Sequence, residues 1–117
     1  MKAGEIPAFF FMKKNFLVIF STAPSLKVAE KIGSALVEEK LAACANITGK
    51  IRSIYSWKGK ICREEEVLMI LKTRKELYSR LEKRLKTLHP YEVPEIIALP
   101  LTAGSRNYLE WILKNTG

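Results

Sequence analysis

The stretch LHPYEVPEI, residues 88–96, gathers the side chains of this chain that are best suited to bind a ligand. It contains the only histidine of the sequence, His89, together with Tyr91, Glu92 and Glu95. Imidazole and carboxylate groups bind divalent metals, but zinc or copper requires about three or four protein ligands. Three interpretations follow: a metal site, one wall of a ligand pocket, or a stiff polar connector.

Two prolines make this stretch rigid. Pro90 and Pro94 fix their own φ angles and favour extended conformations at the residues that precede them. A binding site needs a rigid support for its polar groups. A connector between two elements needs the same rigidity, so the prolines alone do not decide between a site and a connector.

The metal interpretation needs further ligands beside His89. Cys44 is the candidate soft ligand, and Glu92 would supply an oxygen. The alternatives are a histidine that is satisfied by hydrogen bonds and a buried, inert thiol. The second cysteine, Cys62, forms no CxxC pair with the first, which favours reduced thiols and a cytoplasmic protein.

Lys72 ends an apolar segment, and we expect it to pair with a carboxylate of the 88–96 stretch.

Composition narrows the functional classes. A length of 117 residues suits one domain, and the formal net charge of +8 does not by itself name a partner. Arg80, Lys83 and Arg84 share a helix face, which we interpret as a solvated face because no aromatic RNA-binding pattern accompanies it. No apolar run reaches the roughly 18 residues of a membrane span. No phosphate loop, HExxH or serine elbow is present, so we expect neither an enzyme nor a nucleic-acid or membrane partner.

The hydrophobic pattern predicts six elements and a last helix. Residues 16–21 form a buried strand, and an amphipathic helix starts near Ser25. Residues 44–73 form a long hairpin that turns at Gly59 and bulges at Gly49. Its arms are too long for a small sheet, so the overhanging edges predict association between subunits.

The second half of the chain completes the pattern. Thr73 and Glu76 form a capping box before a helix whose buried stripe includes Leu81 and Leu85. Residues 95–102 form a further strand, and Ser105 caps a last helix with Tyr108, Trp111 and Ile112 on one face.

The order is βαββαβ plus a helix, an α+β, ferredoxin-like arrangement with helices on one face of an antiparallel sheet. The other face is apolar and should pack on other subunits. We expect residues 1–15 to be an N-terminal extension and residues 16–117 to be the single domain.

Several segments, taken together and in order, match one family. STAPS, EEKLAACANI, IYSWKGKI, EEEVLMILKT, LHPYEVPEIIALP and YLEWI resemble the CutA family, the divalent-cation tolerance proteins, from about Phe16 to Trp111. The resemblance implies a ferredoxin-like subunit in a PII-like homotrimer. It also implies a role in tolerance to divalent metals, notably copper, and clefts between subunits lined by Ser21, Cys44, Tyr55, Trp57, Lys72, His89, Tyr91 and Glu95.

The chain departs from some copper-linked members at two positions. Ser21 stands where those members have a cysteine, and Leu88 stands where they have a second histidine. His89 and Cys44 are retained and, with Glu92, form the predicted metal set for copper or another divalent metal. The leading hypothesis is a cytoplasmic homotrimer that responds to divalent metals.

Two other functions stay open. One is a PII-like sensory module that binds a small anionic metabolite through Lys72 and His89. The other is a stable trimeric scaffold for partner proteins.

Overall fold

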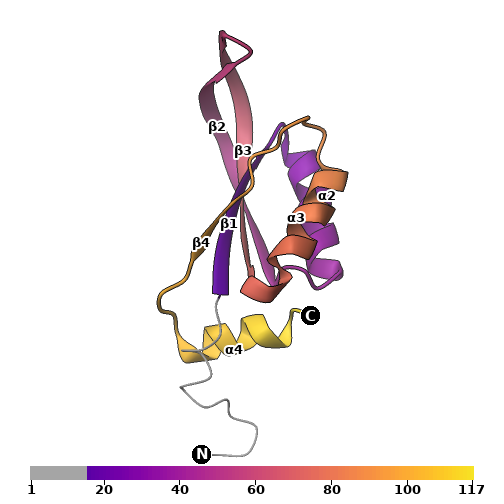
Figure 1. Ribbon diagram of the computed structural model, residues 1–117, viewed down its shortest axis with the longest axis vertical. Helices are drawn as coiled ribbons and strands as arrows, with labels where there is room; N and C mark the ends of the chain where they lie inside the picture. Colours follow the sequence, from indigo (N-terminus) through magenta and orange to yellow (C-terminus); the bar gives the residue numbers. More distant parts are fainter. Residues whose placement is uncertain (1–15) are drawn as a thin grey trace, which may run out of the picture.

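The computed structural model describes residues 16–117 as an α+β fold with a four-stranded antiparallel sheet (Figure 1). The predicted extension, residues 1–15, lies outside the described residues. The elements in chain order are β1 (Phe16–Ala23), α2 (Leu26–Glu38), β2 (Cys44–Trp57), β3 (Lys60–Arg74), the 3-10 turn η1 (Lys75–Leu77), α3 (Tyr78–Leu88), β4 (Ile97–Pro100) and α4 (Arg106–Lys114).

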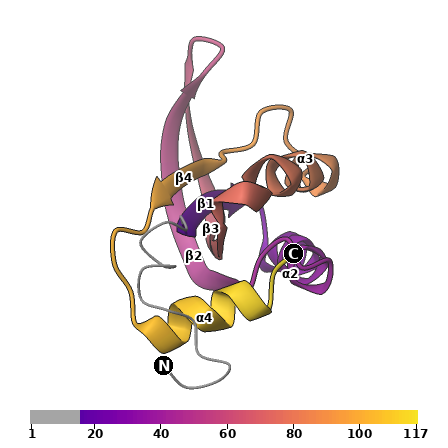
Figure 2. The same cartoon turned by 60° about the horizontal axis from the view of Figure 1, so that its bottom comes forward.

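The sheet has the order β2-β3-β1-β4, which confirms the predicted ferredoxin-like arrangement. Strand β1 pairs antiparallel with β3 from Phe16–Arg74 to Ala23–Val67 and with β4 on its other side. Helices α2 and α3 lie side by side over one face of this sheet (Figures 1 and 2). The core between helices and sheet is built from buried aliphatic side chains, among them Ile19, Ile32, Leu36, Met69, Leu71, Leu81 and Leu85.

The helix boundaries follow local hydrogen bonding. Ser25 accepts a hydrogen bond from the backbone N–H of Val28 and caps α2, as predicted. The capping box predicted at Thr73 is wrong, because β3 continues through Arg74 and the Thr73 hydroxyl donates to the carbonyl of Leu41. A strand that is buried between β1 and β2 gains more from pairing than from an early helix start, so α3 begins at Tyr78 without a side-chain cap.

The hairpin of β2 and β3 extends well beyond the rest of the sheet (Figure 1). Strand β1 pairs with β3 only as far as Val67, so residues 60–66 pair with β2 alone. A register shift between Ile47 and Lys50 confirms the predicted bulge. Lys58 and Gly59 have φ angles of 51° and 80°, the left-handed values that a tight two-residue hairpin turn requires.

The side of the sheet away from α2 and α3 exposes apolar residues. Side chains alternate along a strand, so the neighbours of core-facing Leu17, Ile19 and Ala98 point to this side. We call this surface the open face and define it by Val18, Phe20, Leu68, Ile70, Ile97 and Leu99. Ile97 is 52% exposed and Leu99 is 49% exposed, which confirms the predicted uncovered apolar sheet surface within one protomer.

Helix α4 packs at one end of the sheet. Ser105 caps it by accepting from the N–H of Tyr108. Its buried residues are Leu109 and Ile112, which pack with Phe16 and Ala43. Tyr108 and Trp111, which were predicted to share a face of this helix, are exposed and stack on each other at 5.5 Å between ring centroids. Within residues 16–117 no helix is both long and apolar enough to cross a membrane.

Candidate functional site

Residues 89–96 run from the end of α3 to the start of β4, and we call them the strap. His89 is 7% exposed, and both of its ring nitrogens have partners. The backbone N–H of Tyr91 donates to Nδ1 at 3.1 Å, so the ring proton lies on Nε2, which donates to the carbonyl oxygen of Thr22 at 2.7 Å. No lone pair of His89 is left for a metal in this arrangement. The hydrogen-bonded alternative therefore accounts for His89 within one protomer.

We predict that His89→Ala leaves the affinity for Cu(II) unchanged but destabilises the protein. The substitution removes two hydrogen bonds of a buried group and leaves a carbonyl without its donor, which costs on the order of 1–3 kcal/mol. Calorimetric Cu(II) titration at a temperature where both proteins are folded measures the first effect, and thermal melting measures the second. Cys44→Ser serves as the parallel variant. A tenfold loss of Cu(II) affinity in His89→Ala alone would show that the imidazole is a ligand.

The other two residues of the predicted metal set lie elsewhere. Cys44 is aligned with Lys72 across the β2–β3 pair, and Lys72 is aligned with Val18. His89 bonds to Thr22, four residues further along β1, which is roughly 13 Å at about 3.3 Å per residue. Glu92 is exposed on the strap. Among residues 16–117, no three His, Cys or Glu side chains are grouped so that they could hold a metal ion.

Lys72 has different partners from those predicted. Its ammonium group donates to the side-chain oxygen of Asn46 and lies 3.9 Å from the Cys44 sulfur. The predicted pairing with Glu92 or Glu95 is wrong, because Lys72 projects on the side of β3 where Asn46 and Cys44 of β2 face it. Cys44 in turn donates to Asn46 at 3.4 Å.

The strap forms a pocket with the part of the projecting hairpin next to its turn. We call it the aromatic pocket, and its volume is about 390 Å³. Tyr55 and Trp57 of β2 are two residues apart and therefore project to the same side of the hairpin. The complete lining is Tyr55, Trp57, Cys62, Glu64, Pro90, Tyr91, Glu92 and Val93.

Tyr91 links the strap to β3. Its hydroxyl donates to Glu66 Oε2 at 2.7 Å, and its ring lies 4.7 Å from the His89 ring between centroids. Glu66 is a carboxylate that is only 6% exposed, so this hydrogen bond satisfies a group that would be costly to leave without a partner. The aromatic wall of the pocket is thereby fixed from two sides.

All four tyrosines have raised pKa values, and burial is the largest cause for each. Burial, followed by the hydrogen bond and charge of Glu64, raises the pKa of Tyr55 to about 12. Burial and then the hydrogen bond to Glu66 raise the pKa of Tyr91 still further. Both phenols of the aromatic pocket are therefore neutral at neutral pH.

We predict that Tyr55 and Tyr91 release their phenolic protons well above pH 10 in the native protein, whereas the unfolded chain releases them near that value. A raised pKa in the folded state means that the folded protein holds these protons more tightly. Its contribution to stability is therefore complete below pH 10 and is lost as pH rises through about 12. Tyrosinate absorbance, recorded with and without guanidinium, measures both titrations. Coincident titrations would contradict the assigned environments.

Two predicted cleft residues lie outside this pocket. Ser21 is 0% exposed in the core beneath the helices, so the structure places it away from the surface rather than in a cleft. Its hydroxyl oxygen is buried without a hydrogen-bond partner among the described residues. Glu95 is exposed on the strap but is not part of the pocket lining.

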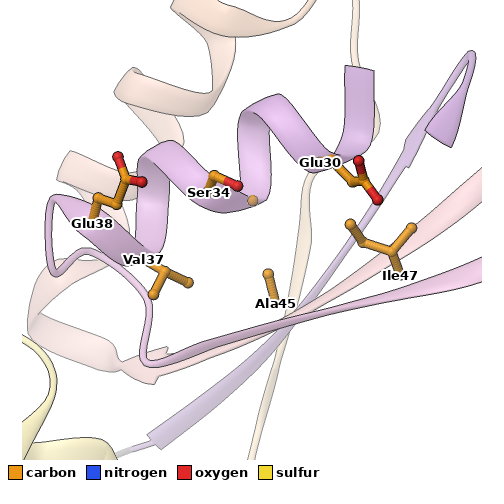
Figure 3. A pocket seen from close by; sticks show the side chains of 7 residues that line it. Glu30, Ser34, Val37, Glu38, Ala45 and Ile47 are labelled. Carbon is orange, nitrogen blue, oxygen red and sulfur yellow. The ribbon is translucent and has the colours of Figure 1, made fainter. Parts of the chain in front are cut away.

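A second, shallower groove lies between α2 and β2 (Figure 3). Val37 from the helix faces Ala45 from the strand across it, and Glu30 and Glu38 stand at its two ends. No residue predicted from the sequence as a ligand contact lines it. The groove therefore adds nothing to the candidate site.

Sequence reasoning missed three residues of the site: Cys62, Glu64 and Glu66. Hairpin register was the signal that could have found the first two, because Tyr55 aligns with Cys62, and Glu64 is the next residue on that side of β3. Glu66 was not predictable in this way, because its partner Tyr91 comes from the strap, 25 positions away.

Comparisons with known proteins agree with this architecture. A protein-family model described as "CutA1 divalent ion tolerance protein" matches residues 17–115. The divalent-cation tolerance protein CutA of Thermus thermophilus is 49% identical over 100 residues, which are 86% of this chain and 97% of that protein. Human protein CutA is 48% identical over 97 residues, 83% of this chain but only 54% of the human protein.

A solved structure gives the same result. The divalent cation tolerance protein (Cut A1) from Thermus thermophilus superposes with a TM-score of 0.85 at 48% identity, covering 87% of this chain and 99% of that one. The names of these relatives describe tolerance to divalent cations and do not name an enzymatic activity. With its matched sequence and fold, the chain belongs to the CutA1 family of divalent ion tolerance proteins.

Proposed function

We propose that this chain is a trimeric module of the divalent-cation response, whose ligand site is the aromatic pocket between the hairpin and the strap. The pocket carries the proposal, because three aromatic rings and two carboxylates converge there on rigid supports. The similarity to proteins named for divalent-cation tolerance supports the link to divalent cations.

The open face and the overhanging hairpin support assembly. Ile97 and Leu99 on the open face and Ile54 and Ile61 on the hairpin are exposed by 52%, 49%, 66% and 61%. Apolar surface of this kind is usually covered by a partner, and a projecting hairpin usually pairs its edges. Packing of three copies through their open faces would cover this surface and place hairpins beside neighbouring subunits.

The arrangement favours a bound small molecule over an intrinsic copper site. The predicted metal set of Cys44, His89 and Glu92 is not gathered in one protomer, and His89 uses both ring nitrogens. An anionic metabolite held by Lys72 and His89 has no such support either, because Lys72 donates to Asn46, away from the strap. We therefore assign the ligand site of the divalent-cation response to the aromatic pocket.

Thermal melting with a panel of ligands tests the proposal. The panel contains Cu(II), Zn(II), nucleotides, carboxylic acids and amines, and a ligand that binds only the folded state raises the melting temperature. Trp57→Leu removes a pocket ring, and Trp111→Leu is its matched control, since the two tryptophans are 40% and 41% exposed. We expect at least one organic compound to stabilise the wild type and the control but not Trp57→Leu. Stabilisation by metals alone, equal in all three proteins, would contradict the proposal.

A further inference from the structure

The aromatic pocket has a chemical character that the proposed function leaves open. Its rings belong to Tyr55, Trp57 and Tyr91, and its ionisable acids include Glu64 and Glu92. No lysine or arginine of residues 16–117 lines it. Aromatic faces and carboxylates attract positive charge, and the pocket lacks the basic side chains that an anionic ligand would require.

This local charge has the opposite sign to that of the whole chain. The formal net charge is +8, yet two carboxylates line the pocket and a third, Glu66, accepts the Tyr91 hydroxyl behind it. The phenols contribute no negative charge at neutral pH, since the pKa values of Tyr55 and Tyr91 are raised. The negative potential of the pocket therefore comes from fixed carboxylates.

One contact within the protein shows that the Trp57 ring can accept a positive charge. The Lys58 ammonium lies 5.6 Å from the centroid of the Trp57 ring, within the range of a cation–π interaction. Lys58 belongs to the hairpin turn, next to Trp57. An ammonium group of a ligand in the pocket would make the same kind of contact with the Trp57 ring.

We propose that the aromatic pocket binds an organic ammonium ion, with the charge against Trp57, Tyr55 and Glu64. The proposal rests on the function proposed above and specifies the class of its ligand. A poorly hydrated organic cation suits this lining better than a divalent metal ion, which holds its water and requires several oxygen or nitrogen ligands together. Among the described residues no such set of ligands is grouped.

Choline and its uncharged analogue 3,3-dimethylbutan-1-ol test the role of charge, because the two molecules have nearly the same shape. The readout is the indole N–H signal of each tryptophan in two-dimensional NMR spectra of the full chain at constant ionic strength. The chain has only two tryptophans, and Trp57→Leu assigns their signals. We expect choline to shift the Trp57 signal and leave that of Trp111 in place, and we expect the alcohol to bind at least about tenfold more weakly.

Glu64→Gln tests the carboxylate with little change of shape. We expect it to weaken choline binding roughly three- to tenfold. Glu65→Gln is the matched control, because it removes the same charge one residue away on the opposite side of β3 and should leave the affinity unchanged. Equal losses in both variants would reduce the effect to overall charge and overturn the specific role of Glu64.

The outcomes separate this inference from the proposed function. Equal binding of choline and the alcohol would overturn a charge-selective pocket. Trp57-dependent binding of acetate or a nucleotide, without binding of choline, would overturn the ammonium assignment and leave the proposed ligand site intact. If no organic compound of any class shifts the Trp57 signal or the melting temperature, both proposals fail together.

Discussion

The double variant Ile97→Glu/Leu99→Glu is expected to be a folded monomer at concentrations where we expect the wild type to form the proposed trimer. Both residues are about half exposed in the protomer, so the carboxylates can remain in water when the chain is alone. In a trimer packed through the open face, the same carboxylates would be buried without partners. Each such burial costs several kcal/mol, so we expect the assembly to weaken by at least about a hundredfold.

Leu26→Glu is the control for this variant. Leu26 is 53% exposed in the first turn of α2, on the helical side of the molecule rather than on the open face. It tests whether an added carboxylate on exposed apolar surface is harmful in itself. Size-exclusion chromatography and circular dichroism distinguish dissociation from unfolding. If the double variant stays trimeric, the open face is not the interface.

Leu71→Ala is expected to destabilise the protein by about 2–5 kcal/mol. Leu71 is 0% exposed in the part of β3 that lies between β1 and β2, where it aligns with Ile19 on one side and Ala45 on the other. Its removal leaves a cavity between the sheet and the helices, which the rigid neighbours fill only in part. The same substitution at Leu26, 53% exposed, should cost far less because little packing is lost.

Leu71→Ala and Leu26→Ala are measured by denaturant unfolding at one protein concentration, because the stability of an assembly depends on concentration. The structure predicts that Leu71→Ala strongly lowers the denaturant concentration at the unfolding midpoint. The dependence of the free energy of unfolding on denaturant concentration should stay the same. Equal midpoints for the two variants would contradict the assigned core. A larger fall of the midpoint in Leu26→Ala than in Leu71→Ala would contradict the assigned core even more clearly.

Sequence patterns were sufficient for the order of elements, because each element had its own local signal. Ser25 and Ser105 cap helices where expected, Gly59 marks the turn, and the bulge falls beside Gly49. The error at Thr73 has a physical reason. A local capping signal competed with strand pairing and with the hydrogen bond to Leu41, which lies 32 residues away, and the long-range contacts won.

The candidate site was predicted less completely, because its contacts are long-range. Three of the predicted cleft residues, Tyr91, Tyr55 and Trp57, line one pocket within the protomer, and the predicted cleft between subunits stays a prediction. No local pattern could show that the nitrogens of His89 are taken by Thr22 and Tyr91, or that Lys72 meets Asn46 rather than a carboxylate. The role of the predicted metal set stays a prediction that the Cu(II) titration tests.

The solution mass of the wild-type protein tests the account most directly, because the proposed function requires three copies of the chain to assemble. Sedimentation equilibrium at micromolar concentration measures this mass without reference to shape. We predict about 40 kDa, three times the 13.3 kDa of one chain, unchanged on dilution. A mass of 13.3 kDa for the folded protein would contradict the trimer and leave the open face without the partner assigned to it.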